Sequence, residues 1–121
     1  MAKKYLPTEA EVEHFKMLNQ LLESVYLEMK EFSKKKPDEP LNAFKVKNVN
    51  RLLIKIKEGL KNEPTIDFLD LLDEETLPTN SDAILIIGQF KASMDRFRGK
   101  YTNEYRRWTT KENPKGDKIY L

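Results

Sequence analysis

Basic side chains recur at two places in the chain with a spacing that suits phosphate groups or an acidic partner. Near the middle, three cations recur every four residues, which places them in one row along a helix: Lys47, Arg51 and Lys55. Farther on, Arg106 and Arg107 precede Trp108, an aromatic ring that could stack on a base. Several cations in one field bind a polyanion by releasing its counterions. We therefore expect these residues to contact phosphate or a partner, unless the row is a solvated helix face.

A dedicated nucleic-acid-binding domain would carry further signals that this sequence lacks. The sequence pI of about 8.7 is below the value typical of such domains. The segment LNAFKVKNVNRLL, which contains the basic row, does not read as a helix-turn-helix, because no short recognition helix follows a tight glycine turn. Nucleic-acid binding is therefore the alternative expectation and not the first.

A block of acidic side chains predicts a surface of opposite charge. In TIDFLDLLDEE, a short helix would place the leucines and a phenylalanine on one side and three carboxylates on the other: Asp67, Asp70 and Glu74. A divalent ion needs oxygen ligands that converge more than those of one exposed helix. We therefore expect an acidic docking face, which meets solvent, the basic row of the same chain, or a partner.

Small residues gather on one side of the last long helical segment: Gly88, Ala92 and Gly99. A glycine inside a helix costs about 1 kcal/mol relative to alanine. Two glycines on one face therefore favour the close approach of another backbone. That backbone belongs either to another helix of this chain or to a second subunit, so the sequence predicts a helix-packing or self-association face.

Chemistry that needs cysteine or paired histidines is closed to this chain. It has no cysteine, and its one histidine, His14, lies beside an apolar stripe, where a structural role is expected. No phosphate-binding glycine loop, serine elbow or zinc-binding helix motif occurs in the sequence. We therefore expect a protein that is not an enzyme, with no catalytic residue, no metal, no cofactor and no small-molecule substrate.

Apolar residues that recur in steps of three and four predict three long helices and one short helix. The first opens on a capping box, in which Thr8 and Glu11 satisfy each other's backbone N–H groups. The expected helices cover residues 8–34, Asn42 to the stop at Pro64, residues 66–75, and residues 82–109. In the last helix the apolar stripe continues through Tyr101 and Tyr105 to Trp108, which predicts a core-facing row of aromatic rings.

These elements predict an all-α fold: a small antiparallel helical bundle of three long amphipathic helices plus one short helix. The length of 121 residues suits a single domain over 1–121, with an N-terminal extension at 1–7 and a polar C-terminal tail at 110–121. If that tail is ordered, its last three residues are expected against apolar surface: Ile119, Tyr120 and Leu121.

Charge alternates along the chain in blocks. Residues 30–61 hold ten basic and four acidic groups (+6), residues 62–90 hold seven acidic groups and no basic one (−7), and residues 91–121 hold nine and four (+5). Complementary blocks of this kind favour oriented association. The longest apolar run, AILII, is far shorter than the roughly 20 residues that span a bilayer, and no secretory signal opens the chain. We therefore expect a soluble, cytoplasmic protein without a membrane partner.

Together these observations favour a non-enzymatic protein–protein interaction or assembly module, which binds a protein partner or another copy of itself. One alternative is a nucleic-acid-associated accessory protein that uses the basic helix face. Another is a regulatory subunit of a larger enzyme complex of the defence or mobile-element type. Small size, abundant charge and the lack of catalytic motifs suit all three.

Overall fold

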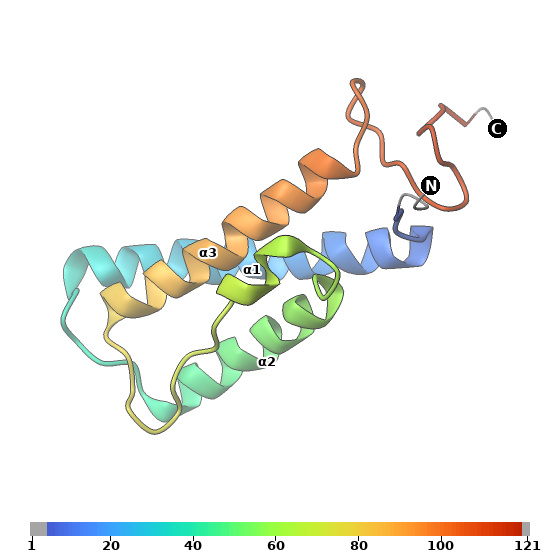
Figure 1. Cartoon of the computed structure of the whole chain (residues 1–121). Helices are drawn as coiled ribbons and strands as arrows, with labels where there is room; N and C mark the ends of the chain where they lie inside the picture. Colours follow the sequence, from blue (N-terminus) through green and yellow to red (C-terminus); the bar gives the residue numbers. More distant parts are fainter. Residues whose placement is uncertain (1–4, 120–121) are drawn as a thin grey trace.

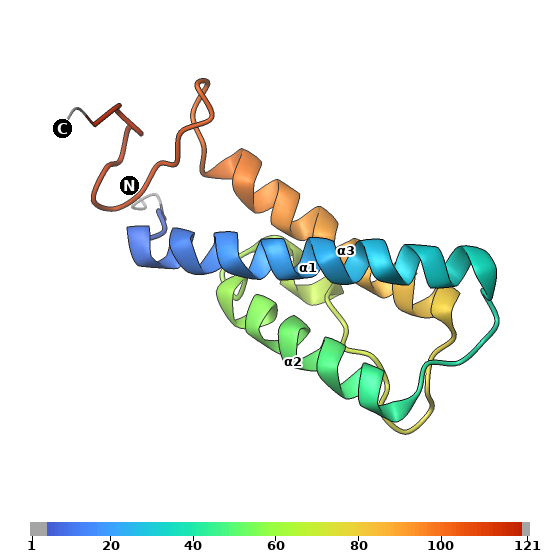
Figure 2. The same cartoon turned by 180° about the vertical axis from the view of Figure 1, so that it is seen from behind.

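Three α-helices and one short 3-10 helix make up the regular structure of residues 5–119 (Figure 1). In the computed structural model, which describes residues 5–119, these elements are α1 (Glu9–Lys35), α2 (Ala43–Gly59), η1 (Pro64–Phe68) and α3 (Asn80–Lys100). α1 runs opposite in direction to α2 and α3, as the view from behind also shows (Figure 2). The described residues form no strand, only two isolated bridges, so the all-α fold class is confirmed. None of the described helices is long and apolar enough to cross a membrane.

α1 begins at the predicted capping box. The Thr8 Oγ1 accepts a hydrogen bond from the Glu11 backbone N–H at 3.0 Å, and the Glu11 carboxylate accepts one from the Thr8 N–H at 3.1 Å. The helix ends at Lys35, because Pro37 has no N–H group with which to continue the ladder. Between these ends one stripe faces the core: Val12, Phe15, Leu18, Leu22 and Met29.

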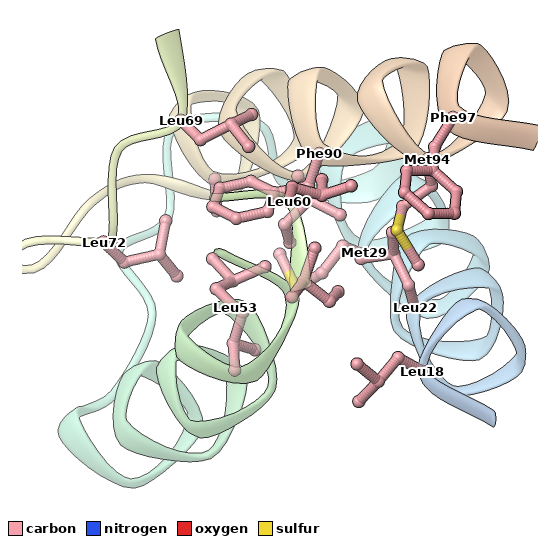
Figure 3. Close-up of a cluster of buried hydrophobic side chains, with 14 of the residues drawn as sticks. Leu18, Leu22, Met29, Leu53, Leu60, Leu69, Leu72, Phe90, Met94 and Phe97 are labelled. Carbon is pink, nitrogen blue, oxygen red and sulfur yellow. The ribbon is translucent and has the colours of Figure 1, made fainter. Parts of the chain in front are cut away.

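The hydrophobic core lies between the three helices and is closed on one side by irregular chain. Figure 3 shows Leu22 of α1, Leu53 of α2 and Phe90 of α3 in one cluster. Leu69 and Leu72, from the segment that follows η1, enter the same cluster from the side. Each such side chain contributes about 1.5–3 kcal/mol by leaving water, so the irregular segment is part of the core and not a surface loop.

The short helix predicted at 66–75 is wrong. η1 ends at Phe68, and the chain beyond it has no regular structure until α3. The reason lies in α2, where the Asn50 Nδ2 donates to the Leu72 carbonyl at 2.8 Å and the Asn50 Oδ1 accepts from the Leu72 N–H at 2.9 Å. A single helical turn nucleates at a cost, whereas the Asn50 side chain satisfies this backbone directly and lets Leu69 and Leu72 reach the core.

The connection between α1 and α2 is hydrogen-bonded to the connection between α2 and α3 at one end of the molecule. The Leu41 N–H donates to the Pro78 carbonyl at 2.9 Å, and the Asn80 N–H donates to the Glu39 carbonyl at 2.8 Å. The Asn80 side chain, which is buried, donates to the Lys36 carbonyl at the end of α1. These bonds fix where α2 and α3 begin relative to the end of α1.

α3 ends at Lys100, and the prediction that it continues to residue 109 is wrong. The Thr109 N–H donates to the Tyr101 carbonyl at 2.7 Å, which folds residues 101–109 back as a hairpin turn. In this hairpin turn Arg106 adopts a left-handed backbone with φ 61°, a conformation that costs roughly 1–2 kcal/mol outside glycine. The Asn103 Oδ1 offsets that cost by accepting from the N–H groups of Tyr105 and Arg107.

The C-terminal segment from residue 110 packs on the start of α1. The Lys111 N–H donates to the Pro7 carbonyl at 2.9 Å, and the Glu112 carboxylate accepts from the Glu9 N–H at 2.9 Å. A carboxylate at a helix N-terminus is favoured because the N–H groups there are unpaired. Ile119 is 68% exposed, so it does not lie against apolar surface as expected, while Tyr120 and Leu121 lie outside the described residues.

We expect Asn50→Ala to lower the free energy of unfolding by about 2–3 kcal/mol, because the Leu72 N–H and C=O would be left buried without partners. Urea denaturation followed by circular dichroism measures this loss. Asn48→Ala is the matched control, since the exposed Asn48 amide donates only to the Phe44 carbonyl of its own helix. A loss of equal size in both variants would contradict the role of Asn50.

Two glycines give a second paired prediction, in which the same substitution has opposite signs. Gly116 has φ +66°, and a Cβ there would lie 2.7 Å from the Asn103 Nδ2, so Gly116→Ala should destabilise the protein by about 1–3 kcal/mol. Gly99 is helical and has no neighbouring atom within 4 Å of such a Cβ, so Gly99→Ala should stabilise it by about 0.5–1 kcal/mol. Thermal unfolding of the two variants beside the wild type checks both signs.

Candidate functional site

An apolar cavity lies between the first half of α1 and the last turn of α2. Its volume is about 360 Å³, and it opens to solvent. Ala10 and His14 of α1 line one side, Gly59 of α2 lines the other, and the rings of Phe15 and Phe97 lie deeper. Ligand sites in proteins are typically concave and mainly apolar with a few polar groups, so this cavity is a candidate binding site.

A second apolar cavity, of about 340 Å³, lies at the opposite end of the same pair of helices. Val25 and Phe32 of α1 line it from one side, and Phe44 and Val49 of α2 line it from the other. Phe44 is one of the most exposed apolar side chains among the described residues. The two cavities therefore lie at the two ends of one helix pair.

Exposed apolar side chains of α1 lie between these two cavities. Leu21 lies seven residues after His14 and four before Val25, spacings that place all three on one side of a helix. Leu21 is 50% exposed and Met17, one turn before it, is 48% exposed. On α2 the half-buried Leu52 lies between the two cavities. We call the two cavities, together with Met17 and Leu21 on the stretch of α1 between them, the α1–α2 groove.

Polar groups stand at the first end of the α1–α2 groove. Burial acts to raise the pKa of Glu11, but hydrogen bonds from the Thr8 N–H, the Tyr5 hydroxyl and the Thr8 side chain outweigh it and hold the pKa below its ordinary value. The Glu11 carboxylate is therefore a fixed negative charge at neutral pH. His14 is exposed beside it, next to the apolar stripe as expected.

The basic row predicted on α2 is present as a row of exposed side chains along the outer side of that helix. Lys55 pairs with Glu58 at 3.9 Å. Lys47 and Arg51 have no carboxylate within ion-pair distance among residues 5–119. The row does not meet the acidic segment in an ion pair, so both charges face solvent in this chain.

The acidic docking face is only partly as predicted. Its three carboxylates are exposed, but they do not share one side of a helix, because η1 ends at Phe68: Asp67, Asp70 and Glu74. Among the described residues no group of three or more histidines and carboxylates is placed to hold a metal ion. The segment also exposes Phe68, so it presents a ring among negative charges.

The small residues of α3 lie on an uncovered face. Ala92 and Gly99 are exposed and Gly88 is half-buried. A Cβ added at either glycine would meet no atom within 4 Å, so no other helix of this chain approaches closely there. The two glycines therefore do not serve close packing against another helix of this chain, one of the two predicted explanations, and self-association through this face stays a prediction.

The other predicted cluster is divided by the hairpin turn. Arg106 and Arg107 are exposed, but Trp108 turns inward and packs on the rings of Phe15 and Phe97, with centroids 5.2 and 6.1 Å away. The expectation that Trp108 is free to stack on a base is therefore wrong. The spacing that seemed to continue a helical stripe belongs to a turn that returns Trp108 to the core.

A buried polar cluster, which the sequence does not reveal, joins the start of η1 to the end of α3. The Glu63 carboxylate, almost fully buried, accepts from the Tyr101 hydroxyl at 2.9 Å and from the Lys100 Nζ at 3.4 Å. Burial, with the Glu63 carboxylate as a second cause, raises the pKa of Tyr101 above its ordinary value. Glu63 follows a helix and precedes Pro64, and nothing in that context distinguishes it from the exposed acids nearby.

We expect Tyr101→Phe to lower the free energy of unfolding by about 1.5–3 kcal/mol, because the charged Glu63 carboxylate loses the hydrogen bond that the Tyr101 hydroxyl donates. The raised pKa of Tyr101 makes its contribution complete below pH about 10 and lost as pH rises further. The wild type should therefore lose stability in alkali more steeply than Tyr101→Phe. Tyr105→Phe, at an exposed tyrosine, should match the wild type in urea denaturation at both neutral and alkaline pH; a Tyr101→Phe curve that did the same would refute this role.

Comparison with known proteins adds no relative from which a role could be transferred. The chain matches no protein-family model, no curated protein and no solved structure.

Proposed function

We propose that this protein is a non-enzymatic interaction module whose α1–α2 groove binds an amphipathic helix of a protein partner. The observation that carries the proposal is the pair of apolar cavities at the two ends of the α1–α2 pair, with exposed Met17 and Leu21 of α1 between them. In this reading the three helices are an incomplete bundle. The partner's helix takes the remaining place beside α1 and α2.

The shape and chemistry of the groove support a helix as the occupant. An amphipathic helix buries side chains spaced by three, four and seven residues, and grooves between helices accept such a row. Methionine suits a surface of this kind because its flexible thioether adapts to different partners. Met17 lies near the middle of the groove, where the partner's row would cross α1.

Charge favours one orientation and one composition of the partner. The outer side of α2 flanks the groove with Lys47 and Arg51, neither of which has an ion pair among residues 5–119. A partner helix with carboxylates along that edge would pair with them, and such complementarity accelerates encounter and sets register. The partner is therefore an apolar helix with an acidic edge.

Selection from a displayed library of amphipathic helical peptides tests this proposal directly. We expect enriched peptides to carry an acidic edge and to lose affinity about tenfold or more on Leu21→Glu, because a carboxylate would be buried in the apolar contact. Leu85→Glu is the matched control, since Leu85 is 65% exposed on α3, away from the groove. Fluorescence polarisation measures both affinities. Equal losses on the two variants, or no enrichment over an unrelated protein, would refute the proposal.

A second variant blocks the groove without adding charge. Gly59 lines the first cavity, and a Cβ there would meet no atom within 4 Å, so Gly59→Leu should fold and occupy the cavity. Gly88→Leu makes the same change on the uncovered face of α3. Loss of peptide binding only in Gly59→Leu supports the groove. Light scattering of Gly88→Leu against the wild type tests the competing form of the proposal, in which the Gly88–Ala92–Gly99 face joins two copies.

A further inference from the structure

A third concave surface lies under the hairpin turn, between α1 and the end of α3. Its volume is about 550 Å³. Lys16 of α1 lines it, together with Arg98 and Gly99 of α3 and Arg106 and Trp108 of the hairpin turn. Figure 1 shows this turn beyond the end of α3, at the far end of the molecule from the start of α2. We call this surface the basic hollow.

The two arginines of the basic hollow are available to an anion. Neither Arg98 nor Arg106 has a carboxylate within ion-pair distance among residues 5–119. Lys16 is held by Glu13 at 3.1 Å, and the one carboxylate that lines the hollow, Asp95, faces Lys91 at 4.0 Å. Guanidinium groups match phosphate oxygens in charge and geometry, so the arginines are the groups on which a phosphate would rest.

The backbone of the hairpin turn holds Arg106 in place at this hollow. Arg106 is the one non-glycine residue with a positive φ among the described residues, at 61°. Its own N–H donates to the Asn103 carbonyl at 2.9 Å, while the Asn103 side chain fixes the residues on either side. An unusual backbone that is held by several bonds commonly marks a functional position. Another part of the lining is also fixed, because Trp108 packs on Phe15 and Phe97.

An exposed aromatic ring lies at the tip of the same turn. Tyr105 is 66% exposed, and the Arg107 guanidinium lies 5.2 Å from its ring centroid. Bases stack on such rings without regard to sequence, and a neighbouring arginine adds to the contact. The hairpin turn therefore presents a stacking surface one residue away from the cation of the basic hollow.

From this juxtaposition we infer that the hairpin turn binds single-stranded nucleic acid. A backbone phosphate rests between Arg98 and Arg106 in the basic hollow, and an adjacent base stacks on Tyr105. Phosphate and base contacts from one turn require a flexible strand whose bases are unpaired, which favours a single strand over a duplex. The binding is independent of sequence, because no base-edge contact is part of it.

Anisotropy of labelled oligo-uridine and oligo-thymidine, first at low salt and then with rising salt, tests this inference. Gly99→Leu should abolish binding, because Gly99 lines the basic hollow with open space at its Cβ position, so that the leucine fills the hollow while the helix is retained. Gly88→Leu, on the same helix outside the hollow, should bind as the wild type does. Equal binding by the two variants would overturn the site.

Substitutions that alter single contacts separate the phosphate from the base. Arg106→Gln should weaken binding and lower the magnitude of the salt slope by about 0.7, the value for one phosphate contact on a single strand. Lys30→Gln removes the same charge from an exposed lysine near the far end of α1, outside both the groove and the hollow, and should leave the affinity and the salt slope unchanged. Tyr105→Ala should weaken binding about fivefold or more, whereas Tyr105→Phe, which keeps the ring, should bind as tightly as the wild type.

Three further results would overturn the inference. No rise in anisotropy at low salt would exclude binding, since the electrostatic contribution is largest there. Equal losses on Arg106→Gln and Lys30→Gln would show attraction to net charge without a site. Binding of pyrophosphate by the wild type, without binding of either oligonucleotide, would show a small-anion site in place of one for single strands.

Discussion

The paired hydrogen bonds between the Asn50 side chain and the Leu72 backbone are the interaction on which the arrangement of this chain depends. An amide side chain carries both an N–H donor group and a carbonyl acceptor, as the backbone of a neighbouring strand does. Asn50 is thereby able to hold irregular chain against α2 inside the core. Because that segment brings Leu69 and Leu72 with it, the core is closed on this side without a fourth helix.

This closure explains why one seam between the helices stays open. The seam between α1 and α3 is filled by the stacked rings of Phe15 and Phe97, with centroids 4.9 Å apart, and is spanned by the ion pair of Glu23 with Lys91 at 3.2 Å. The irregular segment covers α2 and α3. No part of the described chain remains to cover α1 and α2, so their apolar edges line two cavities.

The sequence correctly predicted the features that depend on residues close together in the chain. The capping box at Thr8 and the core stripe of α1 involve residues within a few turns, and both are present. The segment 66–75 and the end of α3 were mispredicted because distant partners decide them: Asn50 lies 22 residues from Leu72, and Trp108 returns to Phe15. Periodicity alone cannot distinguish a stripe that continues from a turn that brings the same residues back to the core.

The site residues divide along the same line. The charges of Lys47 and Arg51 follow from their residue types, but whether a carboxylate pairs with them depends on the whole fold. Within the described residues neither side chain forms an ion pair. The sequence predicted close packing at Gly99. In the structure Gly99 lines the basic hollow, with open space at its Cβ position. The groove and the hollow also share a physical link, since Phe97 lines the first cavity and supports Trp108. A ligand that displaces the Phe97 ring would therefore move a wall of the hollow. A ligand that rests on Met17 and Leu21 would leave that wall in place. Under the two proposals, the depth to which a partner enters the groove would decide whether binding at the two sites is coupled.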